Sequence, residues 1–137
     1  MRFVDTNVLL YVISKAPEET TRAERALQIL EAPDCAMSVQ VLQEFYVQST
    51  RSSRADHLDH RQAVSLIESW CRFPVQELTV AILHAALSCK DRYQIGYWDA
   101  AIVEAARAAG CREVLSEELQ DGQDFGGVRV VNPFRGV

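Results

Sequence analysis

Acidic residues recur along the chain where a strand is expected to end or a helix to begin. Asp5 directly follows the apolar segment 2–4, and Asp99 opens an alanine-rich helix. Glu44 lies within the helix after the second expected strand, and Glu118 lies just past the fourth. Ligands of open α/β sheets bind beyond the carboxyl ends of the strands. If the strands run parallel, the four acids can therefore converge on one cleft.

Clustered carboxylates indicate metal-dependent hydrolysis. Their hard oxygen ligands suit Mg²⁺ or Mn²⁺, and two such ions about 3.5–4 Å apart can activate a water against a phosphodiester. Thr6 and Asn7 follow Asp5 directly, and short polar groups there would orient the carboxylate or a metal-bound water. Taken singly, each acid also has an ordinary structural explanation, such as a helix cap at Asp5 or Asp99. Taken together, acids at several strand exits favour a shared site.

The elements expected around these residues are short strands that alternate with helices, which predicts an α/β domain with a parallel sheet. Ser38 and Thr79 are natural N-caps, Asp56 or Asp59 opens the fourth helix, and Gly110 is placed to end the last one. The expected strands are 2–4, 35–37, 73–78, 113–116 and 128–131, and the expected helices are 6–13, 18–30, 38–48, 56 or 59 to 71, 79–90 and 99–109.

Length and composition are those of one compact domain spanning residues 1–137. No apolar run approaches the roughly 20 residues of a membrane helix, and the first residues lack the apolar core of a secretory signal. The cytoplasm is therefore the expected compartment. The four cysteines have no CxxC spacing, so free, mostly buried thiols are expected rather than a zinc site. The net charge of −5 argues against a general phosphate-binding surface.

Four segments, in this order along the chain, resemble the motifs of PIN-domain nucleases, and in particular the VapC-type toxins of bacterial toxin–antitoxin modules. They are Val4–Leu9, Ser38–Phe45, Tyr97–Ala100 and Leu115–Leu119. The ending Asp121–Phe134 is also similar to a subgroup of that branch. The resemblance spans nearly the whole chain, and four motifs in the right order and spacing are more specific than any one of them.

The resemblance implies a three-layer PIN-like fold, with a small parallel sheet of about five strands flanked by helices, and a Mg²⁺- or Mn²⁺-dependent endoribonuclease. In such enzymes acidic residues hold the metal, and a metal-activated water attacks the RNA phosphodiester. Asp5, Glu44 and Asp99 match the acidic positions of the family.

The polar positions of the family are matched by Thr6, Asn7 and Ser116. At the fourth acidic position the family more often has Asp, whereas this chain has Glu118. The extra methylene of Glu118 shifts its oxygens, so Asp121 is an alternative fourth ligand.

Basic residues are the second requirement of an RNA-cleaving enzyme, because cations hold the RNA backbone. Arg51, Arg54 and Arg61 are grouped around the expected mid-chain loop, and Lys90 and Arg92 precede the third motif. We expect one of these groups to border the cleft, although solvated surface charge explains any single member equally well.

The resemblance also implies two protein partners, a second copy in a homodimer and a cognate antitoxin. The antitoxin segment would lie in a groove and place a basic side chain in the acidic site. A net charge of −5 suits a cationic partner. Helices 18–30 and 38–48 carry apolar residues that would form this groove, although ordinary core packing also explains them.

Other functions share part of the pattern. A haloacid-dehalogenase-like phosphatase also begins with an Asp at the end of a strand, but it needs a second Asp where this chain has Asn7. A dinucleotide-binding domain would need a GxGxxG motif after the first strand, and none is present. The alternative that stays open is a catalytically weak or inactive PIN module that acts by partner or RNA binding, for which Glu118 is the hint.

Overall fold

The computed structural model describes all residues from 1 to 137. One five-stranded sheet has the order β3-β2-β1-β4-β5, and every neighbouring pair is parallel. This confirms the predicted α/β class with a small parallel sheet. The strands are β1 (Arg2–Val4), β2 (Cys35–Ser38), β3 (Val75–Gln76), β4 (Glu113–Leu115) and β5 (Arg129–Val131).

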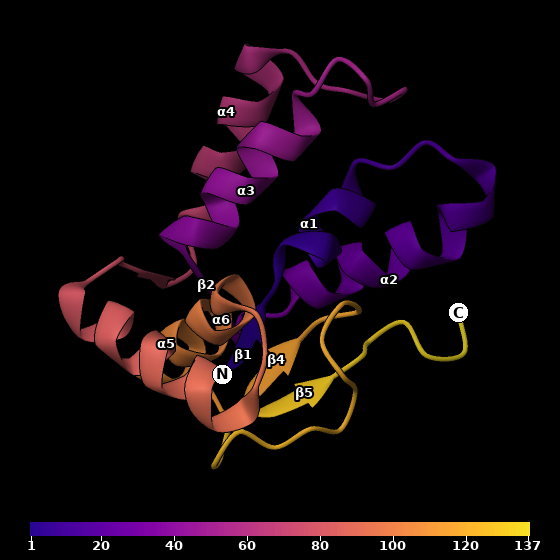
Figure 1. Cartoon of the computed structure of the whole chain (residues 1–137). Helices are drawn as coiled ribbons and strands as arrows, with labels where there is room; N and C mark the ends of the chain where they lie inside the picture. Colours follow the sequence, from indigo (N-terminus) through magenta and orange to yellow (C-terminus); the bar gives the residue numbers. More distant parts are fainter.

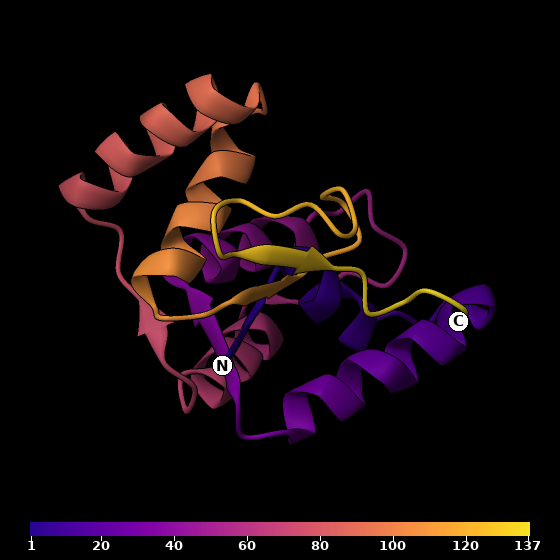
Figure 2. The same ribbon diagram turned by 90° about the horizontal axis from the view of Figure 1, so that it is seen from below.

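Six helices cover this sheet. Figures 1 and 2 show α1 and α2 at one side of the strands and α5 and α6 at the other, while α3 and α4 form a pair that projects beyond them. None of these helices has the length and apolar character needed to cross a membrane. The helices are α1 (Thr6–Val12), α2 (Thr20–Glu31), α3 (Val39–Ser49), α4 (His60–Trp70), α5 (Val80–Tyr93) and α6 (Tyr97–Ala108).

Local capping interactions set most of the helix ends. The hydroxyls of Ser38 and Thr79 accept backbone N–H groups in the first turns of α3 and α5, as predicted. Of the two predicted starts of α4, Asp59 is the one used, and it forms a reciprocal capping box. Gly110 has a φ of 78° just after α6, a conformation that glycine adopts at no steric cost.

Two predicted elements contain a proline at or beside their start. Helix 18–30 begins as a 3₁₀ turn, Pro17–Glu19, and continues as α2 from Thr20, and Pro17 lies in the first turn, where a helix tolerates proline. Segment 73–78 holds the predicted short strand as Val75–Gln76, which begins directly after Pro74, a residue with no N–H group to donate to a sheet ladder.

The core is one cluster of 31 buried residues, and β1 runs through its middle. Phe3 and Val4 are completely buried, so the central strand has no freedom to shift its register. All four cysteines are free and three of them are buried, as predicted. The end of β1 is therefore a rigid point, and the residue that follows it is Asp5.

Candidate active site

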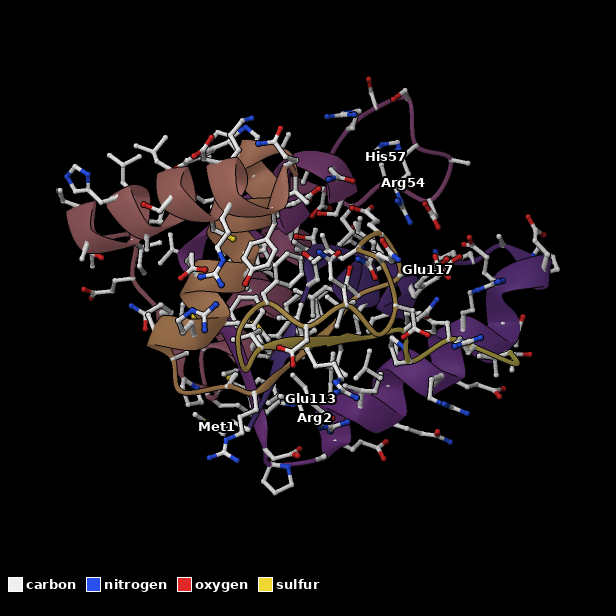
Figure 3. All side chains as sticks on the ribbon, turned by 60° about the horizontal axis from the view of Figure 1, so that its bottom comes forward. Met1, Arg2, Arg54, His57, Glu113 and Glu117 are labelled. Carbon is white, nitrogen blue, oxygen red and sulfur yellow. The ribbon has the colours of Figure 1, made fainter.

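The sheet order places Asp5 at a topological switch point. β2 lies on one side of β1 and β4 on the other, which is where open α/β sheets bind their ligands. Val4 pairs with Leu115 in register, so the residues that follow them, Asp5 and Ser116, leave the sheet side by side. Figure 3 shows Glu117 at this carboxyl edge, at the opposite end of the sheet from Arg2 and Glu113.

The Asp5 carboxylate is buried and oriented by hydrogen bonds. Ser116 Oγ donates to Asp5 Oδ2 over 2.8 Å, and the Thr6 backbone N–H donates to Asp5 Oδ1 over 2.7 Å. Asn7 Nδ2 makes longer contacts with Asp5 Oδ2 at 3.4 Å and with Ser116 Oγ at 3.3 Å. Thr6, Asn7 and Ser116 therefore surround Asp5, in the arrangement expected of groups that support a ligand.

Glu44 comes to the same place from α3. Thr6 Oγ1 donates to Glu44 Oε2 over 2.9 Å, which links this helix to the residue beside Asp5. Gln40 Nε2 donates to the other oxygen, Glu44 Oε1, over 3.0 Å and lies 3.4 Å from the carbonyl oxygen of Trp98. Gln40 was not among the predicted site residues, although its spacing of four from Glu44 on a helix was a usable signal.

Asp99 lies in the first turn of α6 and is not its N-cap. α5 continues beyond the predicted end at Lys90 and stops at Gln94, which has a left-handed φ of 54°. Gly96 is then the N-cap of α6, which places Asp99 where the helix dipole favours a negative charge. The expectation that Asp99 itself caps the helix is wrong, because Gly96 opens the helix earlier.

The charges of the four acids act on one another. The pKa of Asp5 is raised to about 6, chiefly by burial and to a smaller extent by the charges of Glu118 and Glu44, which together outweigh the hydrogen bonds of Ser116 and Thr6. Burial also raises the pKa of Asp99, with a contribution from Glu44. The pKa of Glu118 rises through burial and then through Asp99 and Glu44. The carboxylates of Asp5, Glu44, Asp99 and Glu118 therefore lie within electrostatic range of one another.

The acids are neighbours but do not stand at ligation distance. No group of three His, Cys, Asp or Glu side chains is close enough to hold a metal ion in the present conformation. The set nevertheless fits a hard divalent cation in two respects. It consists of oxygen ligands, and its mutual repulsion is of the kind that a cation relieves. Asp99 and Glu118 are exposed, so their carboxylates have room to turn toward Asp5.

Asp121 does not join this group. Its Oδ1 accepts the backbone N–H of Asn132 over 2.8 Å, and its Oδ2 pairs with Arg135 Nη1 at 2.6 Å. The Asn132 N–H and the Arg135 charge lower the pKa of Asp121. Both oxygens of Asp121 thus hold the C-terminal segment, whereas Glu118 faces the other acids.

The side chain and backbone of Glu117 also form hydrogen bonds within this region. Tyr11 Oη donates to Glu117 Oε1 over 2.5 Å, and Arg22 Nε lies 3.4 Å from Glu117 Oε2. The Glu117 backbone N–H donates to Asn7 Oδ1 over 3.1 Å. Glu117 therefore helps to hold the turn that carries Glu118.

The basic residues predicted to bind RNA do not form one cluster in the structure. Arg54 lines a hollow of about 180 Å³ together with Asn7 and Glu118, and Figure 3 shows it at the same side of the molecule as Glu117. Arg51 is exposed and lines none of the hollows beside the acids. On α5, Lys90 is exposed, and Arg92 lies over the ring of Tyr93, 5.4 Å from its centroid.

Comparisons with known proteins place this architecture in a family. The family model of the PIN domain matches residues 2–119. A comparison with curated protein sequences gives no significant match.

Among solved structures, a toxin–antitoxin complex from Klebsiella pneumoniae has a TM-score of 0.70 at 21% identity and covers 98% of each chain. VapC20 of Mycobacterium tuberculosis, a toxin that cleaves the sarcin–ricin loop, has a TM-score of 0.66 at 20% identity, covering 86% of this chain and 92% of that one. VapBC2 from Rickettsia felis, bound to a promoter DNA fragment, has a TM-score of 0.65 at 16% identity, with 94% and 96% covered. These structures share the fold described above. With the family model matching most of its length, this chain belongs to the PIN-domain family.

Proposed function

We propose that this protein is a divalent-metal-dependent endoribonuclease and the toxin of a toxin–antitoxin pair. The observation that carries the proposal is the electrostatic coupling of Asp5, Glu44, Asp99 and Glu118 at the carboxyl edge of the central strand. Family membership supports a nuclease, and the neighbouring RNA-cleaving toxin supports RNA as the substrate. The absence of a membrane-spanning helix is compatible with action in the cytoplasm, and residues 1–137 would act as one domain.

In this proposal Asp5, Glu44, Asp99 and Glu118 would hold Mg²⁺ or Mn²⁺. When bound, the cation would supply an activated water and stabilise the leaving oxygen of the phosphodiester. The contribution of the chain is to orient the acids. Ser116 directs the Asp5 carboxylate, and Thr6 and Gln40 hold the two oxygens of Glu44.

The test is cleavage of a structured RNA by the purified protein with Mg²⁺, with Mn²⁺ and with EDTA. We expect cleavage only with a divalent metal, and a loss of about a hundredfold or more in Asp99→Asn. Asp121→Asn is the matched control, because it neutralises an acid outside the group. Mn²⁺ binding without cleavage of any RNA would instead favour the alternative of a catalytically weak PIN module that acts by binding.

The antitoxin is proposed to lie along α3 and α4. A groove of about 710 Å³ there is almost wholly apolar and includes Leu42, Val47 and Ile67. Gln43 lines both this groove and the hollow that contains Glu44 and Trp98, so an apolar segment in the groove can extend a basic side chain toward the acids. α2, which we expected to share in the groove, contributes no lining residue.

This assignment is tested by Val47→Glu, which places a charge in the apolar groove. Growth arrest on expression should persist in Val47→Glu while its relief by a co-expressed cognate antitoxin is lost. Neutralisation equal to that of the wild type would show that the antitoxin binds elsewhere.

A homodimer is proposed to form through the outer face of α5. Most of the exposed large hydrophobic side chains of the molecule gather on or beside this helix, namely Leu78, Val80, Leu83, Leu87 and Trp98. Exposed apolar patches of this kind mark protein interfaces. Trp98 also lines the hollow beside Glu44, so a dimer of this form would border the acidic site.

A further inference from the structure

Two polar hollows share two lining residues, Arg54 and Glu19. The smaller one, of about 180 Å³, includes Glu118 of the acid group and is also lined by Asn7 and Glu117. The larger one, of about 640 Å³, is lined by Lys15 and His57. The guanidinium group of Arg54 therefore stands on the border between the acidic site and a second space.

Arg54 is held in place before any substrate arrives. Its Nε lies 2.5 Å from Asp56 Oδ1, an ion pair without hydrogen-bond alignment, since the buried Nε has no hydrogen-bond partner. Its Nη2 lies 3.5 Å from the carbonyl oxygen of Leu10. Asp56 is itself anchored by the backbone N–H of Lys15 over 3.1 Å. Such prior ordering lowers the entropy cost of binding a ligand.

The loop that carries Arg54 also orders His57. The ring Nδ1 of His57 lies 2.9 Å from the carbonyl oxygen of Arg54. Because a carbonyl oxygen only accepts hydrogen bonds, Nδ1 is the donor in this contact, which leaves Nε2 unused by it. The loop is closed at its base by the Leu58 N–H, which donates to the Ser49 carbonyl over 2.7 Å.

The charges of the larger hollow select what part of an RNA fits there. Glu18, Glu19 and Asp56 line it alongside Lys15 and His57, so it offers a second phosphate no net attraction. The neutral donors and acceptors of a base and its ribose do not depend on such attraction. A volume of about 640 Å³ also lies within the range of about 300–1,000 Å³ that is usual for small-ligand pockets.

In the smaller hollow Glu117 is paired with Arg22 and Tyr11, and Glu118 belongs to the proposed metal site. The Arg54 guanidinium is therefore the cation that can meet a phosphate there.

We propose that Arg54 is a positioning residue that binds the phosphate next to the scissile one, and that the nucleoside beyond this phosphate occupies the hollow beside His57 and Lys15. A guanidinium group suits this role, because its planar donors match two phosphate oxygens at once. The inference rests on the proposed ribonuclease function, for which it names one subsite.

The first experiment measures how salt changes the affinity for a labelled single-stranded RNA, in an Asp99→Asn background that does not cut it. Loss of one phosphate contact should flatten the slope of log K against log salt by about 0.7. We expect this flattening and about a tenfold loss of affinity in Arg54→Gln. Arg51→Gln, which removes the same charge from the same loop outside both hollows, should keep the slope.

Arg54→Lys distinguishes a role in RNA binding from a role in folding alone. It keeps the positive charge and loses the paired donors, so it should retain the slope but bind RNA more weakly than Arg54. Thermal unfolding of both variants checks the fold, and Arg54→Lys decides the question if Arg54→Gln does not fold. Wild-type affinity in Arg54→Lys together with a wild-type slope in Arg54→Gln would overturn the proposal, and so would equal losses in Arg54→Gln and Arg51→Gln.

A second experiment locates the phosphate. Single methylphosphonate groups, which carry no charge, replace each phosphate beside the mapped cleavage site. One of these two methylphosphonate substitutions should slow cleavage by the wild type about tenfold. It should have no further effect in Arg54→Gln, because the substitution in the RNA and the substitution in the protein remove the same interaction. Additive effects at both positions would refute the assignment. If the wild type binds RNA without cutting it, the ribonuclease proposal fails, and the salt experiment still decides the role of Arg54.

Discussion

Asp5 shows how strongly its surroundings act on a single carboxylate. It is only 6% exposed, and burial outweighs the hydrogen bonds from Ser116 and Thr6 in setting its pKa. The hydrogen bonds orient the group, but burial, and to a smaller extent the neighbouring acids, make its charge unfavourable. The charge of Asp5 is therefore costly for the fold, and in the proposed function a bound cation would remove this cost.

Without bound metal, the protein should lose stability as the pH rises through the pKa of Asp5. The pKa of Asp5 is raised from 3.8 to about 6 in the folded state, so the folded protein holds the proton longer than the unfolded chain. The protonated Asp5 carboxyl contributes its full stability below about pH 4. This contribution to the free energy of unfolding is lost as the pH rises to about 6, and the total loss is about 3 kcal/mol. Asp99 and Glu118, whose pKa values are also raised, act in the same direction.

Asp5→Asn removes this penalty. In EDTA at pH 7 we expect the variant to be more stable than the wild type by up to about 3 kcal/mol, with the difference shrinking toward pH 5. Urea unfolding at the two pH values measures it. A variant that is less stable than the wild type at pH 7 would show that the hydrogen bonds to Asp5 outweigh the cost of its charge.

A bound metal should make the wild type more stable than Asp5→Asn, which is the reverse of the order expected in EDTA. A ligand that binds only the folded state stabilises it by mass action, by about 2.7 kcal/mol at a hundred times its Kd. Added Mn²⁺ should therefore raise the melting temperature of the wild type and leave that of Asp5→Asn unchanged. Asp121→Asn should respond like the wild type, because Asp121 lies outside the acid group, and an equal response of all three proteins would contradict the site.

At the scale of elements, the site is made by parallel strand ends that meet at one edge. β1 and β4 deliver Asp5 and Ser116 together because Val4 and Leu115 are in register. The Ser116 hydroxyl also accepts the backbone N–H groups of Glu118 and Leu119, over 3.1 Å and 3.2 Å. One hydroxyl thus ties the end of β1 to the turn after β4.

Ser116→Ala tests this connection. The change leaves several buried partners of the hydroxyl unsatisfied, so we expect a loss of about 1–3 kcal/mol in stability and of about tenfold to a hundredfold in cleavage rate. Ser69→Ala is the matched control, because Ser69 is an exposed residue of α4 whose hydroxyl contacts only the Leu66 carbonyl. Similar stability and rate in the two variants would refute the role of Ser116.

At the scale of the whole molecule, the acidic site and the apolar surfaces adjoin. The α3–α4 groove approaches the acids through Gln43, and the exposed side chain of Trp98, at the start of α6, lines the hollow beside Glu44. A chain with a net charge of −5 attracts a cationic partner to such a site. In the proposed function, the RNA, the antitoxin and the second copy would therefore meet around one site.

The proposed dimer can be tested on α5. Leu87→Glu places a charge in the apolar face and should convert the dimer to a monomer, as measured by light scattering during gel filtration. Leu27→Glu is the matched control, since Leu27 on α2 is 47% exposed and Leu87 is 48% exposed. A wild-type protein that is monomeric at every concentration, or a dimer unaffected by Leu87→Glu, would contradict the proposed face.

Much of the fold was predictable because its signals are local. The caps Ser38, Thr79 and Asp59 act within one helical turn, and the order of strands and helices follows from short apolar patterns. The errors are local as well. The first residues of the predicted helix 18–30 form a 3₁₀ turn instead of an α-helix. Gly96 begins α6 before Asp99, because the local backbone geometry overrides a plausible cap.

The sequence by itself determined which residue types stand at the strand ends, since strand, cap and turn preferences depend on nearest neighbours. Only the tertiary structure decided which of them meet. It brings Glu44 to Thr6 across 38 positions of sequence, leaves Asp121 with Arg135, and selects Arg54 over Arg51 as the cation beside the acids. These choices depend on the strand order, on helix packing and on ion pairs between distant segments, and no local pattern encodes such contacts.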